Sequence, residues 1–571
     1  MKTLSLKPIK RNYLKNLENC DWPSLSVYFD ELVKRELGSL SALKIWLKDK
    51  SEIESYLEEN FAWRYIRMST NTESAIYRDD FHYFATEIEP KLAPFSDLLN
   101  KKLIGSPFSI QLDKRPYAIF LRRTRQEIEL YREQNIPIHT QLQLEQQQFA
   151  VITGSMSIEF NGQEYTLEQA SNFLKNTDRS KRESAFAKIA DRRLKDKDAL
   201  DTLFSGLVSL RTEVAINTGF ANFRDYSFSA LGRFDYTVDD TIRFHYAIEK
   251  EIVPILKRLA DYRKIKMGLE VLKPWDTEVD PAGLEALSPF SGGKDLIEKS
   301  ITVFDKLDPW FGECLRTMKE GNLFDVESRM GKAPGGYNYP LAETGAPFIF
   351  MNAADSFRDV TTMVHEGGHA VQTFLDRDLE LNDFKQLPSE VAELASMSME
   401  LISMKYWDIF FADPDDLRRA KKEQLIDSLK TLPWVATIDC FQNWIYTHKN
   451  HTAEERCQAW VEIYDRFGGG FVDFTGFEIY KANLWQKQLH LFEVPFYYIE
   501  YAISGLGAIA VWKNFMENPE KTLGQYKAGL SLGYTCSIKD VYETAGIKFD
   551  FSQEYIKELA SFVQFELDKL L

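Results

Sequence analysis

Apolar residues recur at helical spacing through most of this chain of 571 residues. The pattern is clearest in residues 25–50, 240–268 and 555–571, where apolar positions return every three or four residues. Such spacing places one apolar stripe along a helix, and that stripe must pack against another element. The chain is therefore predicted to be mainly α.

Two segments interrupt the helical pattern. Residues 149–166 alternate apolar and polar side chains around Asn161-Gly162, which predicts a β-hairpin. Residues 329–352 form a Gly- and Pro-rich loop that leads into the apolar run Phe348–Met351, a predicted strand. With a linker-like stretch only at 273–294, we predict an N-terminal helical lobe over residues 1–190, with the hairpin near 149–166, and a second lobe over residues 191–571.

Charge and the length of the apolar runs argue against two kinds of partner. A net charge of −16 without any long Lys/Arg run does not suit a nucleic-acid surface. The most apolar run, residues 501–512, is shorter than the roughly 20 residues of a membrane-spanning helix. We therefore expect neither a nucleic-acid partner nor a membrane.

The cysteines and the N-terminus bear on the compartment. The five cysteines are odd in number and include no CxxC pair, which predicts reduced thiols rather than a disulfide framework. The N-terminal residues carry positive charge, but no continuous apolar stretch follows them. A cytoplasmic location is the expectation.

The segment VHEGGHA, residues 364–370, carries the clearest chemistry. His365 and His369 are four residues apart, so on a helix they project from one face and can bind a single metal ion. Glu366 stands beside them. Two neutral imidazoles, a third protein ligand and an adjacent carboxylate that deprotonates water are the parts of a zinc hydrolase.

A third ligand has to come from elsewhere in the chain. Residues 387–404 are predicted to be helical and place Glu390, Glu393 and Glu400 near one face. Spacing alone does not choose among these three carboxylates.

Two adjacent glycines, Gly367 and Gly368, separate the motif's acid from its second histidine. Each glycine costs about 1 kcal/mol relative to alanine inside a helix. We expect that the missing side chains let another backbone or a bulky aromatic ring approach the metal helix closely. A flexible helix backbone is the competing explanation.

Three separated elements resemble the thimet oligopeptidase and oligoendopeptidase F family of zinc metallopeptidases, in its Pz-peptidase-like bacterial branch. They are HEGGH from His365, AELAS around Glu393, 28 residues after His365, and HLFEVPFYYIEYAISG from His490. The resemblance covers most of residues 330–512. It implies a two-lobed, mainly helical zincin-type fold with a deep central channel and a small active-site β-sheet, in which residues 191–571 form the catalytic lobe.

The resemblance also implies roles for individual residues. Glu393 becomes the third ligand of one Zn²⁺, and Glu400 orients a histidine ligand. The residues implied to support the oxyanion are Tyr501, His490 and Tyr498, with Tyr497 as the alternative to Tyr498. The residues implied to form a substrate-binding edge strand are Phe348, Ile349, Phe350 and Met351.

These expectations describe a zinc-dependent oligoendopeptidase that cleaves internal bonds of short peptides, with Glu366 as general base. A helical zinc carboxypeptidase is an alternative, since it uses the same His-Glu-His geometry but removes residues only from free C-termini. A peptide-binding protein with a non-catalytic metal site is the alternative from another class. The intact Glu366 speaks against it, because a structural site needs no base.

Overall fold

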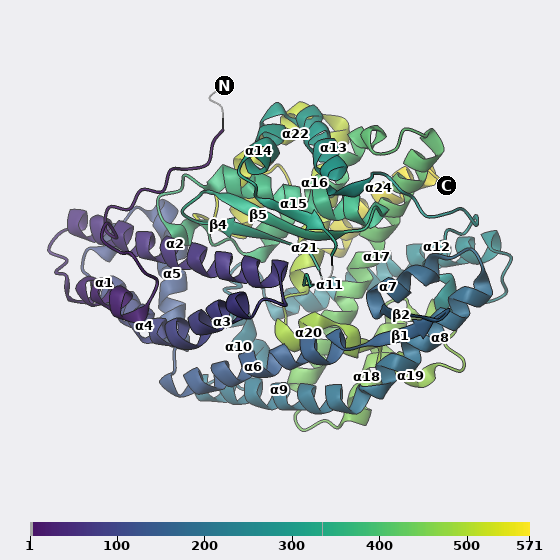
Figure 1. Ribbon diagram of the computed structural model, residues 1–571, viewed down its shortest axis with the longest axis horizontal. Coiled ribbons are helices and arrows are strands. Elements are labelled where there is room, and N and C mark those ends of the chain that lie inside the picture. The colour runs from purple at the N-terminus through teal and green to yellow at the C-terminus, as the bar shows by residue number, and fades with distance from the viewer. Residues whose placement is uncertain (1–3, 330, 334) are drawn as a thin grey trace.

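A computed structural model of the chain describes residues 4–329, 331–333 and 335–571 (Figure 1). Its α-helices before residue 321 are α1 (Trp22–Lys34), α2 (Leu40–Thr70), α3 (Ala75–Tyr83), α4 (Glu89–Gly105), α5 (Lys114–Leu130), α6 (Ile136–Gly154), α7 (Leu167–Ser171), α8 (Arg179–Lys195), α9 (Lys197–Thr218), α10 (Phe223–Ala230), α11 (Val238–Glu251), α12 (Val253–Lys266), α13 (Gly292–Leu307) and α14 (Pro309–Glu320). Those that follow are α15 (Phe357–Asp376), α16 (Ser389–Ser403), α17 (Pro414–Thr447), α18 (Ala453–Arg466), α19 (Glu478–Ala482), α20 (Leu489–Glu493), α21 (Ile499–Glu517), α22 (Pro519–Leu530), α23 (Ile538–Thr544) and α24 (Gln553–Asp568). The prediction of a mainly α fold is confirmed.

Side-chain caps mark where many of these helices begin. Thr237, Ser356, Thr452 and Ser537 each accept a hydrogen bond from the third residue of their helix, whose acidic side chain accepts one in return. This reciprocal arrangement satisfies two backbone N–H groups that otherwise lack partners. Helix starts are therefore encoded locally, including the start of α15.

The hairpin is shorter than its predicted range. Strands β1 (Ser157–Phe160) and β2 (Gln163–Thr166) pair antiparallel, and Asn161 and Gly162 both have positive φ, at 54° and 80°. Residues 149–154 do not belong to it, because they form the last part of α6. Alternation over so few residues is also compatible with the end of a helix.

A second sheet has three strands in the order β3–β5–β4. Strand β5 (Ala346–Ala353) pairs in parallel with β3 (Phe324–Glu327) and antiparallel with β4 (Tyr337–Leu341). The prediction that Phe348, Ile349, Phe350 and Met351 form an edge strand is therefore wrong, because they lie in the central strand. Their consecutive burial is the physical reason, since a run that is apolar on both faces belongs inside a sheet rather than at its edge.

Helices α15, α16 and α21 lie at the centre of the molecule, whereas α1 to α5 lie at one end (Figure 1). Helix α16 packs against α15 and α21, and α15 covers β5. One large core runs from Ala62 to Leu567, and a second unites apolar residues between 14 and 121 with Leu381 and Phe384. The large core includes residues on both sides of position 190, and the lobe boundary there stays a prediction, as does the deep channel.

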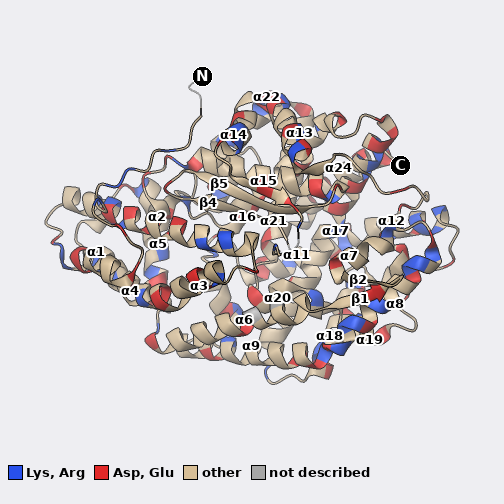
Figure 2. Cartoon of the chain, in the orientation of Figure 1, with Lys and Arg blue, Asp and Glu red and all other residues tan. Residues whose placement is uncertain are grey.

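Acidic and basic residues are mixed along most helices (Figure 2). Within the described part of the chain, no helix combines the length and the apolar character needed to cross a bilayer.

Candidate metal centre and active site

The two histidines of the motif stand one turn apart on α15. Their rings are 4.9 Å apart, centroid to centroid. Both side chains are about one-fifth exposed, at 21% and 19%, so an ion can reach them.

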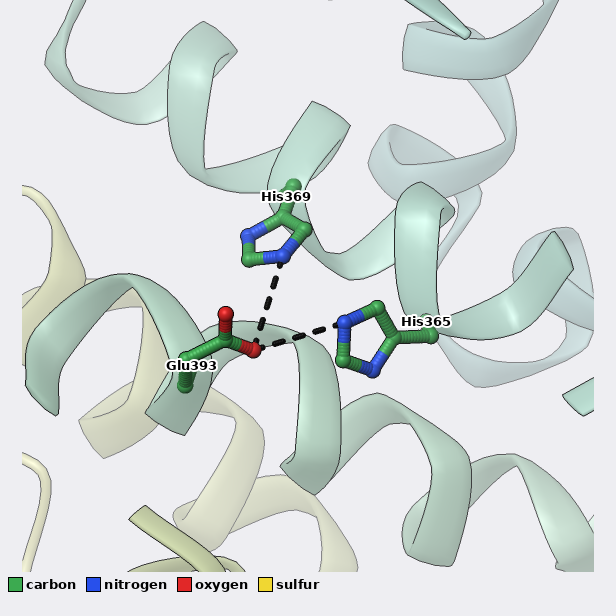
Figure 3. Close-up of side chains that lie close together, drawn as sticks. All are labelled: His365, His369 and Glu393. Carbon is green, nitrogen blue, oxygen red and sulfur yellow. Dashed lines mark ion pairs between the residues drawn. The ribbon is translucent and has the colours of Figure 1, made fainter. Parts of the chain in front are cut away.

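Glu393 on α16 completes the cluster (Figure 3). Its Oε2 lies 3.3 Å from Nε2 of His365 and 3.7 Å from Nε2 of His369. One ligand atom from each of these residues lies within 4.8 Å of the others. Among the described residues, this is the group of three metal-ligating side chains that the structure brings together.

The other two candidate carboxylates have different partners. Glu390 is buried and accepts a hydrogen bond of 2.7 Å from the hydroxyl of Tyr236. Glu400 lies behind His365, where its Oε1 is 2.7 Å from Nδ1. Gln424 on α17 holds the other oxygen of Glu400 at 2.8 Å. Nε2 of His365 is thus left facing Glu393, in the manner of a histidine ligand oriented by a carboxylate.

The glycines of α15 are sites of close approach. A Cβ on Gly368 would lie 2.6 Å from Cα of Ser396 and 2.7 Å from the carbonyl oxygen of Ala395, both on α16. A Cβ on Gly367 would lie 2.5 Å from Cζ of Phe304 on α13. The expectation that a backbone and an aromatic ring approach the metal helix is confirmed at both positions. Glycine at 368 is what lets α16 bring Glu393 up to the histidines.

The donor set fits a zinc ion. Two imidazole nitrogens and one carboxylate oxygen are a ligand set that zinc enzymes use, with one coordination position left open. The separations of 3.3 and 3.7 Å between ligand atoms are short enough for one ion to contact both partners of each pair. The hydroxyl of Ser396 donates to Oε2 of Glu393 at 2.9 Å and fixes that carboxylate.

Protonation of the metal-free cluster follows from its surroundings. Burial opposes a charged imidazole, but hydrogen bonds to Glu393 and Glu400 raise the pKa of His365 well above its ordinary value. Burial likewise opposes ionisation of Glu393, but its contact with His365 lowers the pKa of that carboxyl to about 2. For His369, burial lowers the pKa to about 4. A binding metal ion therefore meets one ionised carboxylate, one neutral imidazole and one imidazole whose proton it must displace.

Glu366 lies next to this cluster without belonging to it. The residue is 6% exposed, and no described residue donates a hydrogen bond to its carboxylate. Burial raises the pKa of Glu366 to about 7. Asn338 of β4 donates to the backbone carbonyl of Glu366 at 3.1 Å, which ties the metal helix to the outer strand of the sheet.

The aromatic residues predicted around the oxyanion gather near Glu393. The ring of Tyr501, on α21, lies 5.4 Å from the rings of both Tyr497 and Tyr498. The ring of His490, on α20, lies 4.8 Å from that of Tyr498 and 6.1 Å from that of Tyr501.

The hydroxyls of the two neighbouring tyrosines differ. That of Tyr497 lies 3.3 Å from Oε1 of Glu393, and that of Tyr498 accepts a hydrogen bond of 3.1 Å from Trp434. Of the two, Tyr497 is therefore the one that reaches a candidate metal ligand, Glu393. The predicted role of Tyr498 stays a prediction. Sequence reasoning missed Asn338, Gln424 and Trp434, because no local pattern indicates a contact between residues so far apart in the chain.

A model of peptidase family M3 matches residues 172–561, which include the whole cluster, and a model of the peptidase M3 N-terminal domain matches residues 15–131. The chain belongs to peptidase family M3. The resemblance to the oligoendopeptidase F branch is confirmed by relatives and by structure.

Two curated relatives are similar over much of the chain. An oligoendopeptidase F homolog of Borreliella burgdorferi is 23% identical over 63% of this chain and 60% of its own length. Oligopeptidase PepF of Bacillus subtilis is 23% identical over 70% of this chain and 58% of its own length. The chain thus matches less than two thirds of either relative.

The solved structure of Pz peptidase A with an inhibitor is similar over almost the whole length of both chains. The two superpose with a TM-score of 0.91 at 26% sequence identity, and the alignment covers 98% of this chain and 99% of that one. The M3 peptidase fold is thereby established.

Replacing Gly368 with Ala should lower the free energy of unfolding by about 1–3 kcal/mol, because the new Cβ meets backbone that cannot move aside. It should also weaken zinc binding, since α16 carries Glu393. The matched control is Gly524→Ala inside α22, where a Cβ meets nothing within 4 Å. That change should stabilise the protein by up to about 1 kcal/mol. Denaturant unfolding measures both, and equal effects would contradict the close-approach explanation.

Zinc binding at pH 7 should release roughly one proton or more per ion, because His365 is protonated in the metal-free chain. The sign follows from its raised pKa: affinity should increase with pH until that pKa is passed. Calorimetric titration in buffers of different ionisation enthalpy counts the protons. Glu400→Gln removes one of the two carboxylates that raise this pKa, so it should release fewer protons and weaken zinc binding about 10- to 100-fold. An unchanged count and affinity in that variant would argue against the orienting role of Glu400.

Proposed function

We propose that this member of the M3 family is a zinc-dependent oligoendopeptidase that hydrolyses internal bonds of short peptides. The observation that carries the proposal is the meeting of His365, His369 and Glu393 at one point, beside a buried carboxylate that is not itself a ligand. A structural metal site requires the first feature but not the second.

Zinc held by these three residues would supply Lewis-acid activation of a water molecule and of the scissile carbonyl. Glu366 would take the proton of that water and later give it to the leaving amine. The environment of Glu366 suits both roles, because a group that acts as general base and then as general acid works best with a pKa near the operating pH. Burial raises the pKa of Glu366 to about 7 in the metal-free chain.

Hydrogen-bond donors near Glu393 would stabilise the negative charge that develops on the carbonyl oxygen. Tyr501 remains the principal candidate, with His490 and Tyr497 beside it. The support for Tyr497 over Tyr498 is the position of its hydroxyl, 3.3 Å from the ligand carboxylate. Donors aimed in advance at such an oxyanion are typically worth about 10²- to 10³-fold in rate each.

Substrate binding along a strand edge would involve β4 rather than β5. Strand β4 is an outer strand, and Asn338 joins it directly to the metal helix. An extended peptide that pairs with β4 would use backbone hydrogen bonds, which carry no side-chain preference. Such pairing suits an enzyme that accepts peptides of many sequences.

Glu366→Gln should leave one zinc ion bound per chain but lower kcat/KM by roughly 10²- to 10⁴-fold, because only the proton acceptor is lost. Hydrolysis of an internally quenched peptide and metal analysis of the same sample measure the two effects. The control is Glu462→Gln on the exposed face of α18, which should match the wild type in both. A Glu366→Gln enzyme with wild-type turnover would exclude this residue as the base.

Amidation of the peptide's C-terminus should leave cleavage of internal bonds largely unchanged, since an endopeptidase needs no free carboxylate. Mass spectrometry of the products identifies the bond that is cut. A helical zinc carboxypeptidase would lose activity on the amidated peptide. A peptide-binding protein would associate with either peptide and release no product even with zinc supplied.

A further inference from the structure

The segment that joins α20 to α21 contains a strained turn directly before the site tyrosines. The N–H of Tyr497 donates to the carbonyl of Val494 at 3.3 Å, with Pro495 and Phe496 between them. Phe496 has a φ of +66°. Proline followed by a residue of positive φ is the pattern of a type II turn, whose third position strongly favours glycine. Phe496 therefore occupies a glycine position.

Burial of the phenylalanine ring is one reason why this conformation persists. Phe496 is fully buried, and its ring lies 5.5 Å from that of Tyr446 and 6.3 Å from that of Phe228. A residue in a disfavoured backbone region persists only where its surroundings over-determine it, and such residues cluster at functional sites.

Two buried polar side chains hold the backbone of Phe496 from opposite sides. Its N–H donates to Oε1 of Gln442, on α17, at 2.5 Å. Its carbonyl accepts a hydrogen bond from Nη2 of Arg233, in the loop between α10 and α11. The same Nη2 lies 2.9 Å from Oε1 of Glu500, in the first turn of α21. Arg233 thus links the turn to the helix that carries Tyr501.

These contacts fix the direction in which the tyrosines leave the backbone. The carbonyl of Phe496 and the N–H of Tyr497 belong to the same planar peptide unit. A hydrogen bond that holds this carbonyl therefore fixes the orientation of the peptide plane that leads into Tyr497. Tyr497 then reaches Glu393, and Tyr501 packs against Tyr497. A slipped turn would move both hydroxyls directly, whereas the histidines and Glu393 lie on other elements, α15 and α16.

We propose that Arg233 and Gln442 are positioning residues that clamp the strained turn at Phe496 and so aim the hydroxyls of Tyr497 and Tyr501 at the reacting carbonyl. This inference rests on the proposed peptidase function. According to this inference, two residues that contact neither substrate nor metal contribute to the catalytic rate.

The competing explanation is that Arg233 only stabilises the fold. A substitution of another buried arginine distinguishes this explanation from the clamp. Arg456 on α18 is 1% exposed, lies 3.2 Å from Asp201 and stacks on Phe204. It makes no described hydrogen bond to residues 494–501. Arg456→Lys therefore reports the loss of a buried guanidinium without disturbance of the turn.

The first experiment compares zinc-loaded Arg233→Lys, Gln442→Leu and Arg456→Lys with the wild type. The two clamp variants should lower kcat by about 10- to 100-fold, as expected for misplaced catalytic groups, with KM and zinc content close to wild type. Hydrogen exchange should quicken in a peptide covering residues 491–502. Arg456→Lys should keep wild-type kcat. Wild-type kcat in both clamp variants, or an equal loss in Arg456→Lys, would overturn the proposal.

The second experiment asks whether Arg233 acts through the tyrosines. In a Tyr497→Phe/Tyr501→Phe background the hydroxyls are gone, so adding Arg233→Lys should change kcat by less than about threefold, whereas independent effects would multiply. A multiplied loss would overturn the clamp. The two hypotheses fail in different ways. If the proposed function is wrong, the zinc-loaded wild type cleaves no peptide. If only the clamp is wrong, the wild type is active and the clamp variants do not show the expected losses.

Discussion

The close contact between α15 and α16 is the constraint on which the site depends. The candidate ligands come from two helices whose backbones are unusually near each other, since at Gly368 the backbone of α16 occupies the space of a Cβ. Helix axes are usually 8–10 Å apart, a distance set by the side chains between them. The local cost of glycine in a helix is thus offset by a contact that places Glu393 within 3.7 Å of both histidines.

Two neighbouring glutamates acquire opposite acid–base properties from this packing. Glu393 is buried beside His365 and Ser396, whose hydrogen bonds stabilise its charge and lower its pKa to about 2. Glu366 is equally buried but has no described donor, so burial raises its pKa to about 7. Environments that separate the pKa values of adjacent titratable groups separate their roles as well. The ligand stays an anion, and the proposed base is able to gain and lose a proton.

The sequence predicts those features that are encoded locally. Helical periodicity and the spacing from His365 to His369 depend on residues within a turn or two of one another. Choosing Glu393 over Glu390 and Glu400 requires knowing which face of α16 meets α15, which spacing does not reveal. Likewise, the run at Phe348–Met351 predicts a strand, but whether that strand is central or at an edge depends on β3 and β4, which lie elsewhere in the chain.

The choice between Tyr497 and Tyr498 also depends on contacts between residues that are far apart in the chain. Counting along a regular backbone assigns each side chain a direction, but Phe496 has a positive φ that its residue type disfavours by about 1–2 kcal/mol. The residue after it, Tyr497, is the one whose hydroxyl reaches Glu393, and the partners that hold the backbone of Phe496, Arg233 and Gln442, are distant in sequence. The glycines of α15 lie between the two candidate histidine ligands, and the phenylalanine at a glycine position directly precedes Tyr497, whose hydroxyl reaches Glu393. Sites that must hold a fixed geometry are expected to overrule local propensity through tertiary contacts, as the contact of α16 with Gly368 and those of Arg233 and Gln442 with Phe496 do here.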